Sequence, residues 1–150
     1  MDKTVLAYIL TDNQYLMLYR NKKQNDMNEG KWLGIGGHLE DGETKEQALI
    51  REIKEETNLD VLSYKFRATL YFYNDDYDEI MYLFTVDEVK GNIKECDEGE
   101  LKYIPKDQIL SLNMWEGDKY FLELLDKDEP YFEMNLIYKD KKLVKVERIN

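Results

Sequence analysis

The stretch over residues 37–59 constrains this chain more than any other, because it joins a glycine-containing loop to one strongly acidic helix. At about 100° per residue, Glu52, Glu55 and Glu56 fall within one arc of roughly 100° on that helix. Like charges this close destabilise a bare helix, and a bound divalent cation would relieve the repulsion. The pattern predicts a metal site. The alternative is a solvated acidic face that pairs with basic neighbours such as Arg51.

The ends of this helix carry signals of their own. Thr44 is followed three residues later by Gln47, which is the spacing of a capping box. Asn58 stands at the other end, where a left-handed backbone is commonly needed and asparagine is the next-best residue after glycine. We therefore predict a helix from about Thr44 to Thr57. Its apolar residues occupy the arc beside the carboxylates, so we expect the carboxylates on the rim of the buried face.

The same segment resembles the Nudix box, a family pattern of glycine, glutamate, Arg-Glu and Glu-Glu at fixed spacing. The residues in register are Gly37, Glu43, Arg51, Glu52, Ile53, Glu55, Glu56 and Leu59, and only Asn58 departs, in place of a glycine. The resemblance implies an α/β (α+β) fold, a Nudix-type α/β/α sandwich with a central mixed sheet and the box as loop-helix-loop. It also implies that water attacks a bridging phosphorus of a nucleoside diphosphate derivative, activated by Mg²⁺ or Mn²⁺.

The site expected from this resemblance extends beyond the box. The acidic loop at residues 95–100 can return Glu98 to the metal, with a solvated charge run as the alternative. The general base is either a box glutamate or Glu98. Arg51, four residues before Glu55, can brace a carboxylate across one helical turn. The expected catalytic and metal-binding groups are Arg51, Glu52, Glu55, Glu56, Glu98 and the backbone carbonyls of Gly36 and Gly37.

Composition narrows the class of protein. The 150 residues fit one domain, residues 1–150. A net charge of -11 argues against binding to DNA or RNA polymers. No stretch approaches the roughly 20 apolar residues of a membrane span, and the start lacks a secretory signal. We expect a cytoplasmic monomer that acts on a small-molecule nucleotide. A single cysteine, Cys96, and a single histidine, His38, leave no Cys/His metal cluster to expect.

The remaining chain predicts mostly β-structure. Three hairpins are expected, over residues 4–10 with 15–19, 61–73 with 79–87, and 131–138 with 143–149. Short strands are expected at residues 32–37 and 101–104. Pro105 favours a helical turn through Leu110, and a second full helix is expected from about Trp115 to Leu125. The aromatic residues between 66 and 84 favour core packing, with a base pocket as the alternative.

Basic residues gather just before the box. Arg20, Lys22, Lys23 and Lys31 flank or occupy a polar loop at residues 21–31. Phosphate contact is the functional hypothesis for them, with Arg20 and Lys23 as the substrate-binding candidates. A solvated loop is an equal alternative for Lys22 and Lys23.

Segments outside the box look like those of MutT-like oxidised-purine nucleoside triphosphatases, especially the 8-oxo-dGTP diphosphatases of Gram-positive bacteria. These segments are residues 30–32, 95–98, 107–109 and 114–121. By this resemblance Trp115 stacks on the base, Asp118 hydrogen-bonds its edge, and Phe121 helps to wall the pocket. Stacking on an indole is worth about 1–3 kcal/mol per base. The alternatives are core packing for Trp115 and a surface carboxylate for Asp118.

Two positions depart from the relatives. Leu33 stands where animal relatives carry a base-reading amide, so purine selection at this substrate-binding position must lean on Asp118 and on backbone groups. His38 stands where many relatives carry lysine, and we expect it to contact phosphate or solvent.

Together these features predict a Mg²⁺-dependent pyrophosphohydrolase. It would convert oxidised purine nucleoside triphosphates such as 8-oxo-dGTP to the monophosphate and pyrophosphate, and so cleanse the nucleotide pool. The enzymatic alternative is a Nudix hydrolase of ADP-ribose or a dinucleoside polyphosphate. The alternative from another class is a non-catalytic module that senses a nucleotide or binds a protein, against which the intact box glutamates argue.

Overall fold

The computed structural model of the chain describes residues 1–22 and 26–150. The strands are β1 (Asp2–Thr11), β2 (Gln14–Tyr19), β3 (Trp32–Leu33), β4 (Ile35–His38), β5 (Asp60–Asn74), β6 (Tyr77–Lys90), β7 (Glu100–Pro105), β8 (Phe132–Lys139) and β9 (Lys142–Arg148). The helices are α1 (Lys45–Thr57), the 3₁₀ helix η1 (Lys106–Ser111) and α2 (Glu116–Asp126).

Within these residues nine strands form one mixed sheet. Its order is β3-β2-β1-β6-β5-β8-β9, with β4 also paired to β1 and β7 to β2. The β1/β6 and β5/β8 pairs are parallel, and the other pairs are antiparallel. The predicted central mixed sheet is confirmed. The three predicted hairpins are the antiparallel pairs β1/β2, β5/β6 and β8/β9, of which β5/β6 is longer than the sequence indicated.

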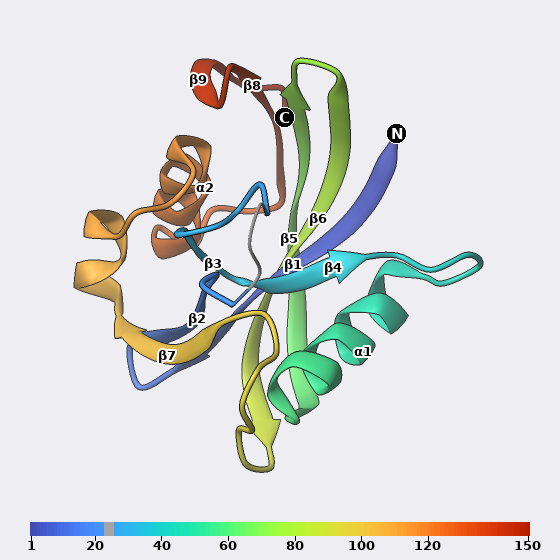
Figure 1. The fold of residues 1–150 in the computed structure, drawn as a ribbon, viewed down its shortest axis with the longest axis vertical. Coiled ribbons are helices and arrows are strands. Elements are labelled where there is room, and N and C mark those ends of the chain that lie inside the picture. The colour runs from blue at the N-terminus through green and yellow to red at the C-terminus, as the bar shows by residue number, and fades with distance from the viewer. Residues whose placement is uncertain (23–25) are drawn as a thin grey trace.

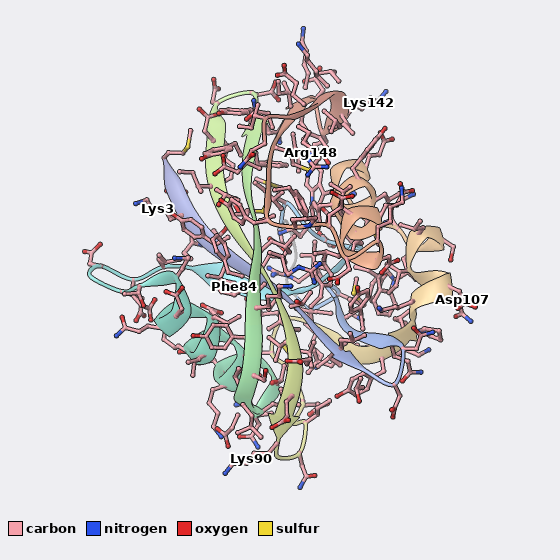
Figure 2. All side chains as sticks on the ribbon, turned by 180° about the vertical axis from the view of Figure 1, so that it is seen from behind. Lys3, Phe84, Lys90, Asp107, Lys142 and Arg148 are labelled. Carbon is pink, nitrogen blue, oxygen red and sulfur yellow. The ribbon has the colours of Figure 1, made fainter. Side chains whose placement is uncertain are left out.

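The sheet separates two hydrophobic cores, and α1 and α2 cover opposite sides of it (Figure 1). Alternate residues of β1 enter the two cores, since Ala7 packs with α1 and Tyr8 packs with α2. Phe84, labelled near the middle of the sheet in Figure 2, is fully buried in the α1 core. No helix in the described part of the chain is long and apolar enough to cross a membrane.

Helix α1 has the predicted caps. The Gln47 N–H donates to Thr44 Oγ1 at 3.1 Å, and the Thr44 N–H donates to Gln47 Oε1 at 2.9 Å. Asn58 adopts the left-handed conformation, with φ of 70°, and its N–H donates to the Lys54 carbonyl. These bonds satisfy backbone groups that a helix end otherwise leaves open, so both ends of the carboxylate-bearing helix are fixed.

We predict that Thr44→Ala lowers the free energy of unfolding by about 1 kcal/mol, the typical cost of removing an N-cap side chain. Urea unfolding of the purified protein measures this. Thr44→Ser keeps the hydroxyl and is the matched control, with a midpoint expected close to that of the unaltered protein. An alanine variant as stable as the serine variant contradicts a stabilising role for the cap.

Candidate active site

Helix α1 brings two of its three expected carboxylates to a cavity of about 620 Å³. Glu52 and Glu56 line this cavity together with Glu98. Glu55 differs, because its side chain is 59% exposed and is held by Arg51 at 3.2 Å. The structure therefore gathers Glu52, Glu56 and Glu98 in one place and leaves Glu55 on the outer side of the cluster.

Strand β4 lies directly against these carboxylates. The Gly36 N–H donates to Glu56 Oε2 at 3.1 Å. A Cβ atom added at Gly37 would lie 2.5 Å from the Glu52 carboxyl carbon, so only a glycine allows this approach. Both glycines also line the cavity. The structure thus places Gly36 and Gly37 beside Glu56 and Glu52, and the expected role of their carbonyls as metal ligands stays a prediction.

Arg51 holds the acidic cluster from one side. It donates to both oxygens of Glu43, from Nε at 2.7 Å and from the second guanidinium nitrogen at 2.9 Å. It also donates to Glu52 at 2.8 Å and to the His38 carbonyl at 3.0 Å. The hydrogen bonds from Arg51 to Glu43 lower the pKa of Glu43 to about 2. The predicted contact of Arg51 with Glu55 is present, and it is one of several that Arg51 makes with carboxylates. The two-point contact with Glu43 was not predicted, although Glu43 is a fixed position of the family pattern.

Glu56 is the buried member of the cluster. It is 7% exposed, and among the described residues its Oε1 has no hydrogen-bond partner. The Glu98 carboxylate lies within 4.8 Å of it, although the two residues come from different elements. Burial, followed by the proximity of Glu98, raises the pKa of Glu56 well above its ordinary value. Two facing carboxylates both accept, so they hydrogen-bond only when one holds a proton, and a cation between them removes that need.

The basic residues near the box have separate positions. Arg20 lines the cavity and pairs with Asp26 at 2.7 Å and with Glu98 at 3.6 Å. The Lys22 ammonium donates to the Cys96 carbonyl at 2.9 Å and so anchors the acidic loop. Lys23 lies outside the described residues.

The far wall of the cavity carries most of the expected base-binding residues. Leu33, Trp115 and Asp118 line it. The Trp115 indole N–H donates to Asn28 Oδ1 at 2.7 Å, and Phe72 packs edge-on against the indole. Trp115 is therefore part of the core and of the cavity wall at once, so its two sequence interpretations are compatible.

Asp118 is enclosed and not a surface residue. Its side chain belongs to the buried set, with the residue 6% exposed. Burial raises the pKa of Asp118 to about 8, with Lys31 opposing the rise and Glu79 adding to it. The alternative of a solvated carboxylate in the first helical turn is thereby corrected.

Phe121 is not where the sequence placed it. It is fully buried and packs against Tyr8 in the α2 core, and it is not among the residues that line the cavity. It lies three residues after Asp118, so it shares the inward face of α2 and supports the cavity wall from within the core.

A hydrogen-bonded polar group on β1 and β6 lines the cavity and was not predicted. Thr4 donates to Glu79 at 2.7 Å, and the Tyr77 hydroxyl donates to the other Glu79 oxygen at 2.8 Å. All three residues line the cavity. Thr4 and Glu79 are 75 positions apart, and the parallel β1/β6 pairing brings them together, which no local pattern signals.

The sequence matches a known protein family over most of its length. The model of the NUDIX domain matches residues 2–125. The chain belongs to the Nudix family. A Nudix hydrolase of Bacillus subtilis, the uncharacterized YvcI, is 30% identical over 135 residues, 86% of this chain and 82% of that protein. The oxidized purine nucleoside triphosphate hydrolase of mouse is 31% identical over 105 residues, 69% of this chain and 67% of that protein.

Solved structures share the Nudix fold. The MutT protein of Bacillus halodurans matches with a TM-score of 0.89 at 22% identity, covering 99% of this chain and 98% of that one. The chain is therefore a Nudix hydrolase with MutT-like neighbours. Nudix hydrolases generally use a divalent metal, and the residues here fit one, because Glu56 and Glu98 bring carboxylate oxygens within 4.8 Å of each other and one buried Glu56 oxygen has no partner among the described residues.

We predict that Gly37→Ala lowers the metal-supported hydrolytic activity of this Nudix enzyme by about 10- to 100-fold, since the new methyl group displaces the Glu52 carboxylate. Activity is measured as kcat/KM alongside a thermal melt.

The matched control is Gly42→Ala. Gly42 lies in the loop before α1 with φ of +77° and open space around it, so this change strains the backbone without touching a carboxylate. It should cost stability and spare activity. Equal activity losses in both variants contradict the specific role of Gly37.

Proposed function

We propose that this Nudix hydrolase is a Mg²⁺-dependent pyrophosphohydrolase of purine nucleoside triphosphates, including oxidised ones such as 8-oxo-dGTP. The products would be the nucleoside monophosphate and pyrophosphate. The observation that carries the proposal is that a single cavity is lined by the box glutamates Glu52 and Glu56 and also by Trp115 and Asp118. A cavity of about 620 Å³ is in the range of small-molecule sites. Relatives named for oxidised-purine triphosphate hydrolysis in mouse and for 8-oxo-dGTP hydrolysis in Proteus vulgaris support it.

At the phosphate end, the residues proposed to hold the divalent ion are Glu52, Glu56 and Glu98, with Glu55 and the backbone carbonyls of Gly36 and Gly37 completing the set. When bound, such an ion neutralises diphosphate oxygens and makes a water molecule a better nucleophile. The chain itself fixes the geometry, because Arg51 keeps the Glu52 carboxylate against β4.

The proton of the attacking water goes to a carboxylate of the same cluster. Burial raises the pKa of Glu52, although Arg51 opposes the rise, and a raised pKa suits a group that accepts a proton near neutral pH. Glu98 is the second candidate, since it lines the cavity from the opposite loop.

At the base end, the proposed purine lies against Trp115 with its edge at Asp118. Because its pKa is about 8, Asp118 is mostly protonated at neutral pH, so it can both donate and accept a hydrogen bond. A purine edge offers both kinds of group. Leu33 supplies only apolar contact, so discrimination rests on Asp118 and on backbone groups.

The proposed role of the enzyme is the removal of damaged nucleotides from the cytoplasmic pool, carried out by a monomer.

A substrate panel tests the proposal. With Mg²⁺ and 8-oxo-dGTP, dGTP, ATP, ADP-ribose and diadenosine polyphosphates, we expect the highest kcat/KM for a purine triphosphate and the release of pyrophosphate. Glu56→Gln, assayed on the same panel, should lose activity by about 10²-fold or more while staying folded, because a coordinating oxygen and its charge are gone. Clear preference for ADP-ribose over every triphosphate would refute the substrate assignment.

The protonation of Asp118 makes a second prediction. As pH rises through about 8 the carboxyl ionises and loses its donor, so KM for the purine triphosphate should rise, by up to about tenfold per pH unit. Asp118→Asn is the matched control, because an amide keeps a donor and an acceptor at every pH. Its KM should not follow this alkaline rise. An identical rise in both proteins would assign the pH dependence to another group.

A further inference from the structure

The chain has one cysteine, and the structure carries it into the acidic cluster. Cys96 lies in the loop between β6 and β7 and is 3% exposed. The loop is fixed on both sides. Lys94 N–H donates to the Thr57 carbonyl at 3.1 Å, and Lys22 donates to the Cys96 carbonyl at 2.9 Å. A Cβ at Gly99 would collide with the Tyr19 backbone, so the loop passes close to β2.

The Cys96 sulfur is grouped with two carboxylates. Its Sγ and one oxygen each from Glu56 and Glu98 all lie within 4.8 Å of one another. Glu56 is more than nine-tenths buried, and its Oε1 has no partner among the described residues. A potential sulfur ligand therefore lies within 4.8 Å of a carboxylate oxygen of the buried Glu56.

Donor chemistry distinguishes this set from carboxylates alone. Mg²⁺ takes oxygen ligands and has little affinity for sulfur, whereas Zn²⁺ and related ions accept both thiolate and carboxylate. Zn–S and Zn–O bonds are about 2.3 Å and 2.0–2.2 Å, so in the tetrahedral geometry of zinc two donors on one ion lie roughly 3.5 Å apart. The three donors lie within 4.8 Å of one another, so they come onto one ion by a contraction of at most roughly 1 Å.

We propose that Cys96 is a metal ligand that acts with Glu56 and Glu98, and that it gives the site a preference for thiophilic divalent cations such as Zn²⁺ and Cd²⁺ over Mg²⁺. The inference rests on the proposed metal-binding role of Glu56 and Glu98. Formation of the sulfur–metal bond displaces the thiol proton to solvent, and no change of oxidation state is involved. A thiophilic ion held this way competes with Mg²⁺ for the same carboxylates.

The test uses Cd²⁺ as the probe, added as the chloride to the protein of 150 residues. Bound Cd²⁺ should produce the ultraviolet charge-transfer absorption of a cadmium thiolate at one equivalent, and with a single cysteine the signal has one source. Cys96→Ser should abolish the band and weaken Cd²⁺ binding, measured by calorimetry, by at least about tenfold, as even the loss of outer-shell partners typically does. Binding of Mg²⁺ in the same calorimeter should change far less, because a thiol contributes little to it.

Glu56→Gln keeps the thiol and removes the buried carboxylate, so it tests whether the sulfur acts with the cluster. It should weaken Cd²⁺ binding and reduce the thiolate band at one equivalent. Two outcomes would overturn the proposal. One is the absence of a thiolate band in the unaltered protein at saturating Cd²⁺. The other is a band that Glu56→Gln leaves unchanged, which would mean that sulfur binds metal alone.

The outcomes also separate this inference from the proposed function. Hydrolysis of purine triphosphates with Mg²⁺ in a protein that shows no thiolate band refutes the ligand role of Cys96 and leaves the proposed activity intact. A thiolate band in a protein that hydrolyses none of the triphosphates refutes the proposed substrate and leaves the ligand role intact.

Discussion

The candidate site requires that three carboxylates, Glu52 and Glu56 of α1 and Glu98 of the loop before β7, line one cavity despite their like charges. At an effective dielectric constant of about 20, two like charges 4 Å apart repel each other by about 4 kcal/mol. Repulsion among charged Glu52, Glu56 and Glu98 would therefore cost a large part of the roughly 5–15 kcal/mol by which a domain is stable. Three features offset it. Arg51 neutralises the outer side, the Gly36 N–H donates to Glu56, and proton uptake is favoured where burial is deepest. The apolar inner face of α1 anchors the helix that carries the charges.

The cavity is lined by two unlike groups of residues, which come from different elements. Carboxylates from α1 and the 95–100 loop gather at one end, while Trp115 and Asp118 come from the start of α2 on the other side of the sheet. Strand β1 runs beside both, since Thr4, Val5 and Leu6 line the cavity while Val5 lies in the α1 core and Leu6 packs against the α2 core. A ligand that spans the cavity therefore meets a charged end fixed by one helix and an aromatic end fixed by the other.

Local signals were sufficient for the helix and its caps, but not for the assembly of the site. The capping box and the turn at Asn58 depend on residues a few positions apart, and both were predicted correctly. Glu98 was an open alternative, because a charge run gives no sign of where its loop returns. The Thr4–Glu79 bond follows from a parallel strand pairing across 75 positions and was missed. Phe121 was placed in the pocket by resemblance, whereas the rotation of α2 turns it into the core.

The pairing of the arginines bears on how an acidic protein binds a polyanion. Both arginines that line the cavity are already held by carboxylates, Arg20 by Asp26 and Glu98, and Arg51 by Glu43 and Glu52. Their charge is largely neutralised before any ligand arrives. The net charge of the whole chain is -11, so long-range electrostatic attraction does not draw a polyanion to the protein either. On the proposed function, the positive charge that the described residues bring to the phosphates comes mainly from divalent ions bound by the carboxylates. On the proposed function, the acidic cluster is then what makes triphosphate binding possible, since it concentrates the cations that the substrate needs.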